Sequence, residues 1–87
     1  MGRVLAVFKI MPDDMEHYDE IKEAIQENIP EEAKLEEIRE EPIAFGLKAL
    51  VVGVSMDDTG GILDKVEEAL NKIPHVESVS FEGSTLI

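Results

Sequence analysis

The side chains in this sequence that could perform covalent chemistry are two histidines and four serines. An activated serine needs a histidine or lysine that accepts its proton. No serine of this sequence has an evident histidine or lysine companion. The serines are Ser55, Ser78, Ser80 and Ser84. His17 and His75 form no ligand set with the nearby carboxylates, so we expect both on the surface. The chain has no cysteine, which excludes thiolate and disulfide chemistry. We therefore expect no enzyme.

Carboxylates dominate the charge, with 20 Asp and Glu residues against 8 Lys and Arg and a net charge of −12. Nucleic-acid binding depends on basic residues that neutralise phosphates, so direct nucleic-acid binding is not expected. Pairs such as Asp57-Asp58 could bind Ca²⁺ or Mg²⁺ weakly, but no EF-hand loop is present. We expect no required cofactor and no specific metal site. The acids keep the protein soluble, and they could also steer it towards a basic protein partner, since the two roles are compatible.

The residues best suited to binding another protein lie in the segment from 41 to 48. Gly46 supplies the backbone freedom for a tight turn, which places Phe45 at the tip between Ala44 and Lys48. Phe45 then either folds over the sheet edge or stands exposed as an interface anchor. A second apolar group, Leu86 and Ile87, ends the chain.

A weak internal repeat predicts the elements that carry these residues. Two apolar, β-branched runs, Val4–Met11 and Leu47–Met56, each end near an acidic pair. A segment of helical period follows each run, and both segments stop at an Ile-Pro pair. The spacing from Asp14 to Pro30 equals that from Asp58 to Pro74. Extended segments follow at 34–43 and 76–81.

This order predicts the split β-α-β, or ferredoxin-like, α+β fold over a single domain of residues 1–87. Right-handed crossovers give a four-stranded antiparallel sheet of order 4-1-3-2, with two helices on one face. Leu35 and Ile38 do not share an alternating face, so the second strand needs a bulge or a late start. We expect a monomer.

Local signals predict the helix starts and the location of the protein. Asp13 and Glu16 suggest a capping box, and Asp58 or Thr59 a cap for the second helix. Gly60-Gly61 predicts a flexible turn before that helix.

The first residues predict a strand rather than a signal peptide, and no apolar run approaches the ~20 residues that span a bilayer. We expect a cytoplasmic protein that does not contact membranes.

The hairpin and two further motifs resemble a known family. Pro42–Lys48 resembles the Pro-x-x-Phe/Tyr-Gly-hydrophobic-Lys hairpin of the guanine-nucleotide-exchange domain of elongation factor 1-beta. Val54–Asp58 is similar to that family's third strand with its acidic pair, and His75–Val79 to the stretch that enters its last strand. The resemblance spans essentially the whole chain and looks like the short archaeal form.

The resemblance implies a protein that binds elongation factor 1-alpha and speeds the replacement of its GDP by GTP. It gives Phe45 the role of pressing into the G domain. Eukaryotic members carry a penultimate lysine that reaches towards the magnesium site, whereas Leu86 stands here. Phe45 and the terminal apolar residues would then contribute more. The alternative is an ACT-like regulatory module that binds a small ligand, although such modules usually place a glycine-rich turn after the first strand.

Overall fold

The periodic segments of the sequence become two helices and four strands in the computed structural model, which describes residues 2–87. The elements are β1 (Arg3–Pro12), α1 (Tyr18–Asn28), β2 (Ala33–Pro42), the short 3₁₀ turn η1 (Ala44–Gly46), β3 (Lys48–Asp57), α2 (Ile62–Asn71) and β4 (Val76–Leu86). No helix within this described part of the chain is long and apolar enough to cross a bilayer.

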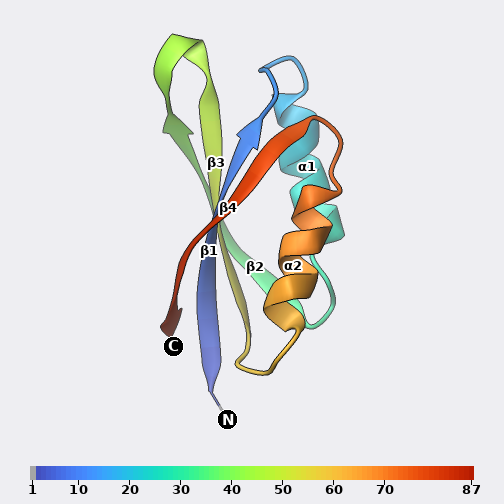
Figure 1. The fold of residues 1–87 in the computed structure, drawn as a ribbon, viewed down its shortest axis with the longest axis vertical. Coiled ribbons are helices and arrows are strands. Elements are labelled where there is room, and N and C mark those ends of the chain that lie inside the picture. Colours follow the sequence, from blue (N-terminus) through green and yellow to red (C-terminus); the bar gives the residue numbers. More distant parts are fainter. Residues whose placement is uncertain (1) are drawn as a thin grey trace.

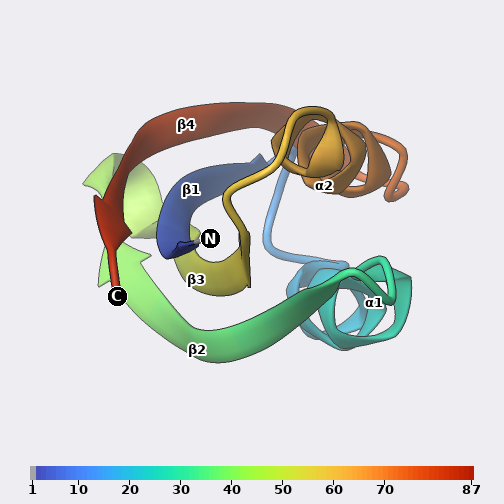
Figure 2. The same ribbon diagram turned by 90° about the horizontal axis from the view of Figure 1, so that it is seen from below.

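The strands form one antiparallel sheet in the order β2-β3-β1-β4, which is the predicted order read from the other edge. Both helices cover the same face of this sheet and leave the opposite face open (Figures 1 and 2). The ferredoxin-like α+β fold is therefore confirmed. The molecule is elongated, with extents of 43 × 20 × 16 Å, because the strands run beyond the helical layer.

The core lies between the helices and the sheet. Burial alternates along β1, whereas central β3 is buried along most of its length. The largest fully buried side chains include Phe8, Ile10, Ile21, Ile25, Leu50 and Leu70. Burying one such side chain contributes about 1.5–3 kcal/mol, so these contacts supply most of the stability of so small a domain.

The predicted irregularity of β2 is a β-bulge. Leu35 is opposite Val54, but the next aligned pair joins Glu37 to Gly53, so Glu36 is the extra residue. Because the bulge adds one residue between Leu35 and Ile38, the two side chains point to the same face of the sheet. Both pack against the core.

The predicted end of β4 at Phe81 is wrong, because the strand continues to Leu86. Phe81 is opposite Phe8 and Gly83 is opposite Val7, so Glu82 is bulged out of the ladder. The glycine at the bulge has φ +138°, a value that L side chains rarely adopt. Glu-Gly-Ser-Thr resembles a turn in sequence, but pairing with β1 holds it extended.

Both predicted helix caps are also wrong. Helix α1 begins after His17, which makes no capping side-chain bond, while Asp14 Oδ1 accepts the N–H of Glu16 at 2.8 Å in the preceding turn. Helix α2 begins after Gly61, whose φ of +93° is left-handed. The cap of α1 thus lies four residues after Asp13, and that of α2 lies two residues after Thr59.

The two adjacent glycines before α2 provide a matched test of this entry turn. We expect Gly61→Ala to lower the free energy of unfolding by about 1–2 kcal/mol, because alanine is strained at positive φ. A Cβ on either glycine would meet open space, and Gly60 does not have a positive φ. Gly60→Ala should therefore change stability by no more than about 0.5 kcal/mol. Chemical denaturation of both variants checks this, and equal losses would contradict the entry turn described here.

Candidate functional site

The β2–β3 hairpin projects beyond the helices at one end of the molecule (Figure 1). Strand pairing continues to Pro42 and Lys48, and the loop is closed by Ile43 N–H, which donates to the carbonyl of Leu47 at 2.8 Å. Within the loop, Phe45 at φ +64° and Gly46 at φ +77° are both left-handed. Gly46 thus adopts the conformation predicted for a tight turn.

Phe45 stands at the tip and is 99% exposed, so the alternative in which it folds over the sheet edge is wrong. A left-handed conformation costs a non-glycine residue roughly 1–2 kcal/mol, and an exposed phenyl ring gains nothing from burial. The strain is unfavourable in the isolated protein, and the ring adds nothing that offsets it. Neither feature of Phe45 contributes to folding, which makes it a candidate for an interaction.

An ion-pair network ties the base of the hairpin to helix α1. Glu40 on β2 lies 3.2 Å from the ammonium of Lys22 on α1 and 3.5 Å from that of Lys48 on β3. The hydrogen bond from Lys22 is the main reason why the pKa of Glu40 lies below its ordinary value. Lys48 therefore faces Glu40 on the helical side of the sheet.

Tyr18, the first residue of α1, lies beside this network and is 6% exposed. Within residues 2–87 its hydroxyl has no hydrogen-bond partner. Burial, together with the negative charge of nearby Glu40, raises the pKa of Tyr18 to about 12.

The remaining site residues, Leu86 and Ile87, lie at the other end of the molecule (Figure 1). They are 72% and 66% exposed. Leu86 is opposite Val4, whereas the hairpin extends past the far end of β1. Eight residues of strand separate Val4 from Pro12, a distance of about 26 Å. The structure thus groups Ala44, Phe45, Gly46 and Lys48 and separates the chain end from them.

The two histidines, far apart in sequence, are stacked with ring centroids 3.7 Å apart and an interplanar angle of 14°. His17 Nδ1 lies 3.0 Å from Glu20, and His75 Nδ1 lies 3.4 Å from Asp13. Both rings remain partly exposed, as predicted, but sequence spacing could not reveal the stack. It joins the β1–α1 loop to the α2–β4 loop, and Asp13 N–H also donates to the carbonyl of His75 at 2.8 Å.

Ser55 is the serine with a charged neighbour suited to activate it, but it is buried. Its hydroxyl donates to Glu36 at 2.6 Å and accepts from Arg3 at 3.1 Å. At 1% exposure, Ser55 cannot be reached by a substrate. The contact instead joins β1, β3 and the bulge of β2.

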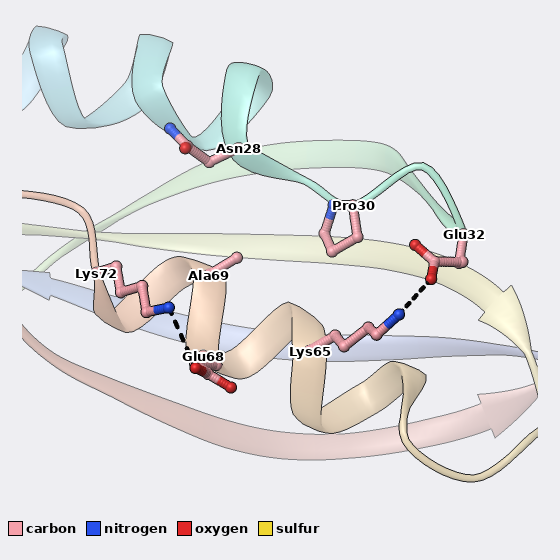
Figure 3. A pocket seen from close by; sticks show the side chains of 7 residues that line it. All are labelled: Asn28, Pro30, Glu32, Lys65, Glu68, Ala69 and Lys72. Atoms are coloured by element: carbon pink, nitrogen blue, oxygen red, sulfur yellow. Dashed lines mark hydrogen bonds and ion pairs between the residues drawn. The ribbon is translucent and has the colours of Figure 1, made fainter.

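A groove of about 410 Å³ separates the end of α1 from α2 (Figure 3). It is lined by Asn28, Pro30, Glu32, Lys65, Glu68, Ala69 and Lys72. Lys65 pairs with Glu32 at 2.5 Å and Lys72 with Glu68 at 3.2 Å, so each ammonium already has a carboxylate partner. The Lys65 hydrogen bond lowers the pKa of Glu32 and raises that of Lys65 itself, so both stay charged. Neither group is suited to proton transfer.

Within residues 2–87, no three His, Asp or Glu side chains converge where a metal ion could bind.

The fold and these sites together define a small α+β domain that presents an exposed aromatic residue on a projecting hairpin. The model of the family described as the EF-1 guanine nucleotide exchange domain matches residues 5–87. The chain therefore belongs to this family of nucleotide-exchange domains of translation elongation.

Relatives named elongation factor 1-beta are similar over nearly their full length. The one from Methanosarcina acetivorans is 48% identical over 81 residues, which cover 91% of each chain. The one from Methanocella arvoryzae is 39% identical over 85 residues, or 97% of this chain and 96% of the relative. These similarities give the ACT-like alternative no support.

A solved structure, the C-terminal domain of the MgtC protein from Mycobacterium tuberculosis, shares the fold. Its TM-score is 0.54 at 15% identity, and the match covers all of this chain and 88% of that one. At this identity the likeness concerns the fold alone.

Because Tyr18 is the single tyrosine of the chain, its titration can be followed directly by ultraviolet absorbance. We expect its phenol to titrate with a pKa of about 12 instead of the ordinary 10.0. The raised value belongs to the folded state, so unfolding releases a proton above pH ~10. The free energy of unfolding should therefore be unaffected by this group below pH ~10 and fall as the pH rises towards 12.

Glu40→Gln is the matched control for this titration. It removes the neighbouring negative charge, so the pKa of Tyr18 should drop but remain above 10, because burial is the larger cause. A Tyr18 phenol with an ordinary pKa in the folded protein would contradict the proposed environment of Tyr18. A pKa that Glu40→Gln leaves unchanged would contradict it as well.

Proposed function

We propose that this protein accelerates the exchange of GDP for GTP on elongation factor 1-alpha by binding its G domain and stabilising the nucleotide-free state. Membership of the exchange family supports a role in translation elongation. The single observation that carries the finer proposal is Phe45, fully exposed on a strained hairpin tip. The proposal requires no cofactor and places the protein in the cytoplasm, as a monomer when free.

The proposed mechanism needs binding energy but no covalent step. A bound nucleotide is released slowly because its phosphate, metal and base contacts must break together. A factor that binds the nucleotide-free carrier more tightly than the GDP-bound carrier lowers nucleotide affinity by the same coupling free energy. Excess nucleotide should accordingly dissociate the complex.

The hairpin supplies the contact that would distinguish these two states. Phe45 acts as the wedge, Ala44 and Gly46 allow the backbone to approach closely, and Lys48 holds the base of the hairpin through Glu40. A wedge is effective only when it does not bend away, and the ion pairs to α1 restrain it. Leu86 and Ile87 would form a separate contact at the far end.

The charge distribution suggests how the encounter is oriented. Residues 13–32, which include α1, contain nine Asp or Glu residues and one lysine, so they carry −8 of the net charge of −12. The negative potential is thus concentrated on the α1 side of the helical layer. A basic surface on the partner would be attracted mainly towards that side.

The central test measures the release of labelled GDP from elongation factor 1-alpha at substoichiometric amounts of this protein. We expect the wild type to accelerate release and Phe45→Ala to lose tenfold or more of this activity. Losing an interface anchor typically costs about 2 kcal/mol or more, and 1.4 kcal/mol is a factor of ten. An unchanged GDP release rate with the wild-type protein would refute the proposed function.

Stability measurements separate the wedge role from a folding role. Phe45→Ala should change the free energy of unfolding by no more than about 0.5 kcal/mol, as is usual for exposed positions. Phe45→Gly should be more stable than Phe45→Ala by about 1 kcal/mol, because glycine relieves the left-handed strain, while remaining equally inactive. A stable and fully active Phe45→Ala variant would exclude the wedge mechanism.

The electrostatic part of the proposal predicts a salt-dependent association rate. Raising the ionic strength to physiological values, where the screening length is about 8 Å, should slow association with the partner. The double variant Glu23→Gln, Glu27→Gln on α1 should slow it further at low salt. The variant Glu77→Gln, Glu82→Gln on β4 removes the same charge elsewhere and should have a smaller effect. If the two double variants have equal effects, or if the association rate in stopped-flow measurements does not depend on salt, the acidic residues serve solubility alone.

A further inference from the structure

The two edges of the sheet are protected very differently. Edge strand β2 carries charged side chains at six of its ten positions, a common defence against pairing with foreign strands. Edge strand β4 is 11 residues long, pairs with β1 on one side, and carries Glu77 and Glu82 as its charged residues. β4 is the last strand in the order of the sheet and lies on the outer side of β1 in Figure 2.

The charges of β4 are also poorly placed to protect it, because both lie at bulges. Pro12 is opposite Val76 and Met11 is opposite Ser78, which leaves Glu77 as the extra residue. Glu82 is likewise the extra residue of the second bulge. The regular stretches Ser78–Phe81 and Gly83–Leu86 are free of charge, and strand geometry directs alternate N–H and C=O groups of each outwards.

Apolar side chains line the same edge. Within residues 2–87, the large hydrophobic side chains that remain exposed are Phe45, Phe81, Leu86 and Ile87, and three of these lie on β4 or directly after it. Phe81 is 42% exposed although its ring lies 5.5 Å from that of buried Phe8. Phe81 and Leu86 are opposite Phe8 and Val4, so both lie on the helical face of the sheet. Ser80 and Thr85 lie on the open face.

We propose that the free edge of β4 binds an extended peptide segment by strand addition. Apolar side chains of this segment would cover Phe81 and Leu86 on the helical face, and its alternate side chains would be basic. Main-chain hydrogen bonds give affinity in this mode of recognition, and alternate side chains give specificity. Glu77 and Glu82 are the charged side chains of β4, so the edge itself favours a basic segment, and the net charge of −12 opposes a second copy of this chain as the occupant.

This inference does not involve the hairpin, so it can hold or fail separately from the role proposed for Phe45, but it shares Leu86 with the contact proposed for the chain end. The test uses the whole protein and a capped nine-residue peptide of alternating valine and lysine. Nuclear magnetic resonance should show shift changes and slowed amide exchange at alternate residues of 78–86. A peptide of the same sequence, N-methylated at four central peptide groups to remove donors on both of its edges, should bind about tenfold more weakly or not at all.

Protein variants locate the contact. Leu86→Ser and Phe81→Thr should each weaken peptide binding by about fivefold to tenfold, because each removes apolar surface beside the added strand. Leu86→Ser is the safer of the two for folding, since its side chain is mostly exposed. Phe45→Ser removes an even more exposed apolar side chain, which lies beyond the far end of β1 from Leu86, and should leave peptide affinity unchanged.

Three results would overturn the inference. Equal binding of the N-methylated peptide would show that charge alone attracts it. Shift changes confined to the acidic face of α1 would place the peptide elsewhere. Concentration-dependent dimers in sedimentation, with β4 amides already protected in the free protein, would show that a second copy occupies the edge.

Discussion

Two amphipathic helices bury their apolar sides against one face of a four-stranded sheet, and this burial decides which parts of the strands stay uncovered. Ile25 on α1 and Leu70 on α2 are fully buried in the cluster that these helices form with the sheet. Because the helices have 11 and 10 residues, they cover only the middle of strands whose pairing extends further. The uncovered strand ends form the hairpin at one end of the molecule and the β4 terminus at the other (Figure 1).

The fold could be predicted because its signals are local and repeated. Each helix follows an apolar strand and stops near an Ile-Pro pair, and the handedness of crossovers leaves one topology. The hairpin tip was also predictable, since Phe45-Gly46 can hardly be accommodated inside a small core. What the sequence did not reveal depends on partners distant along the chain. Pairing with β1 keeps β4 extended past Gly83. The stack of His17 on His75 exists only because the β1–α1 loop meets the α2–β4 loop.

The distribution of charge complements the distribution of exposed apolar groups. Acidic side chains gather around α1, whereas the exposed large apolar residues lie on the hairpin and along β4. A small domain with a bare strand edge and an exposed phenyl ring risks self-association. A net charge of −12 opposes the approach of identical copies without covering either apolar site. The same charge can therefore serve solubility and partner choice.

The start of β1 and the end of β4 lie together, far from the hairpin. Ile87 N–H donates to the carbonyl of Arg3 at 3.0 Å, and this start of β1 and the end of β4 lie at the end of the molecule opposite the β2–β3 hairpin (Figure 1). A fluorophore, affinity handle or surface anchor attached beyond Gly2 would thus leave the hairpin pointing away from the support. Fusion to a larger protein through that end would preserve access to the tip, and a short linker closing the termini would permit new chain ends to be opened in another loop.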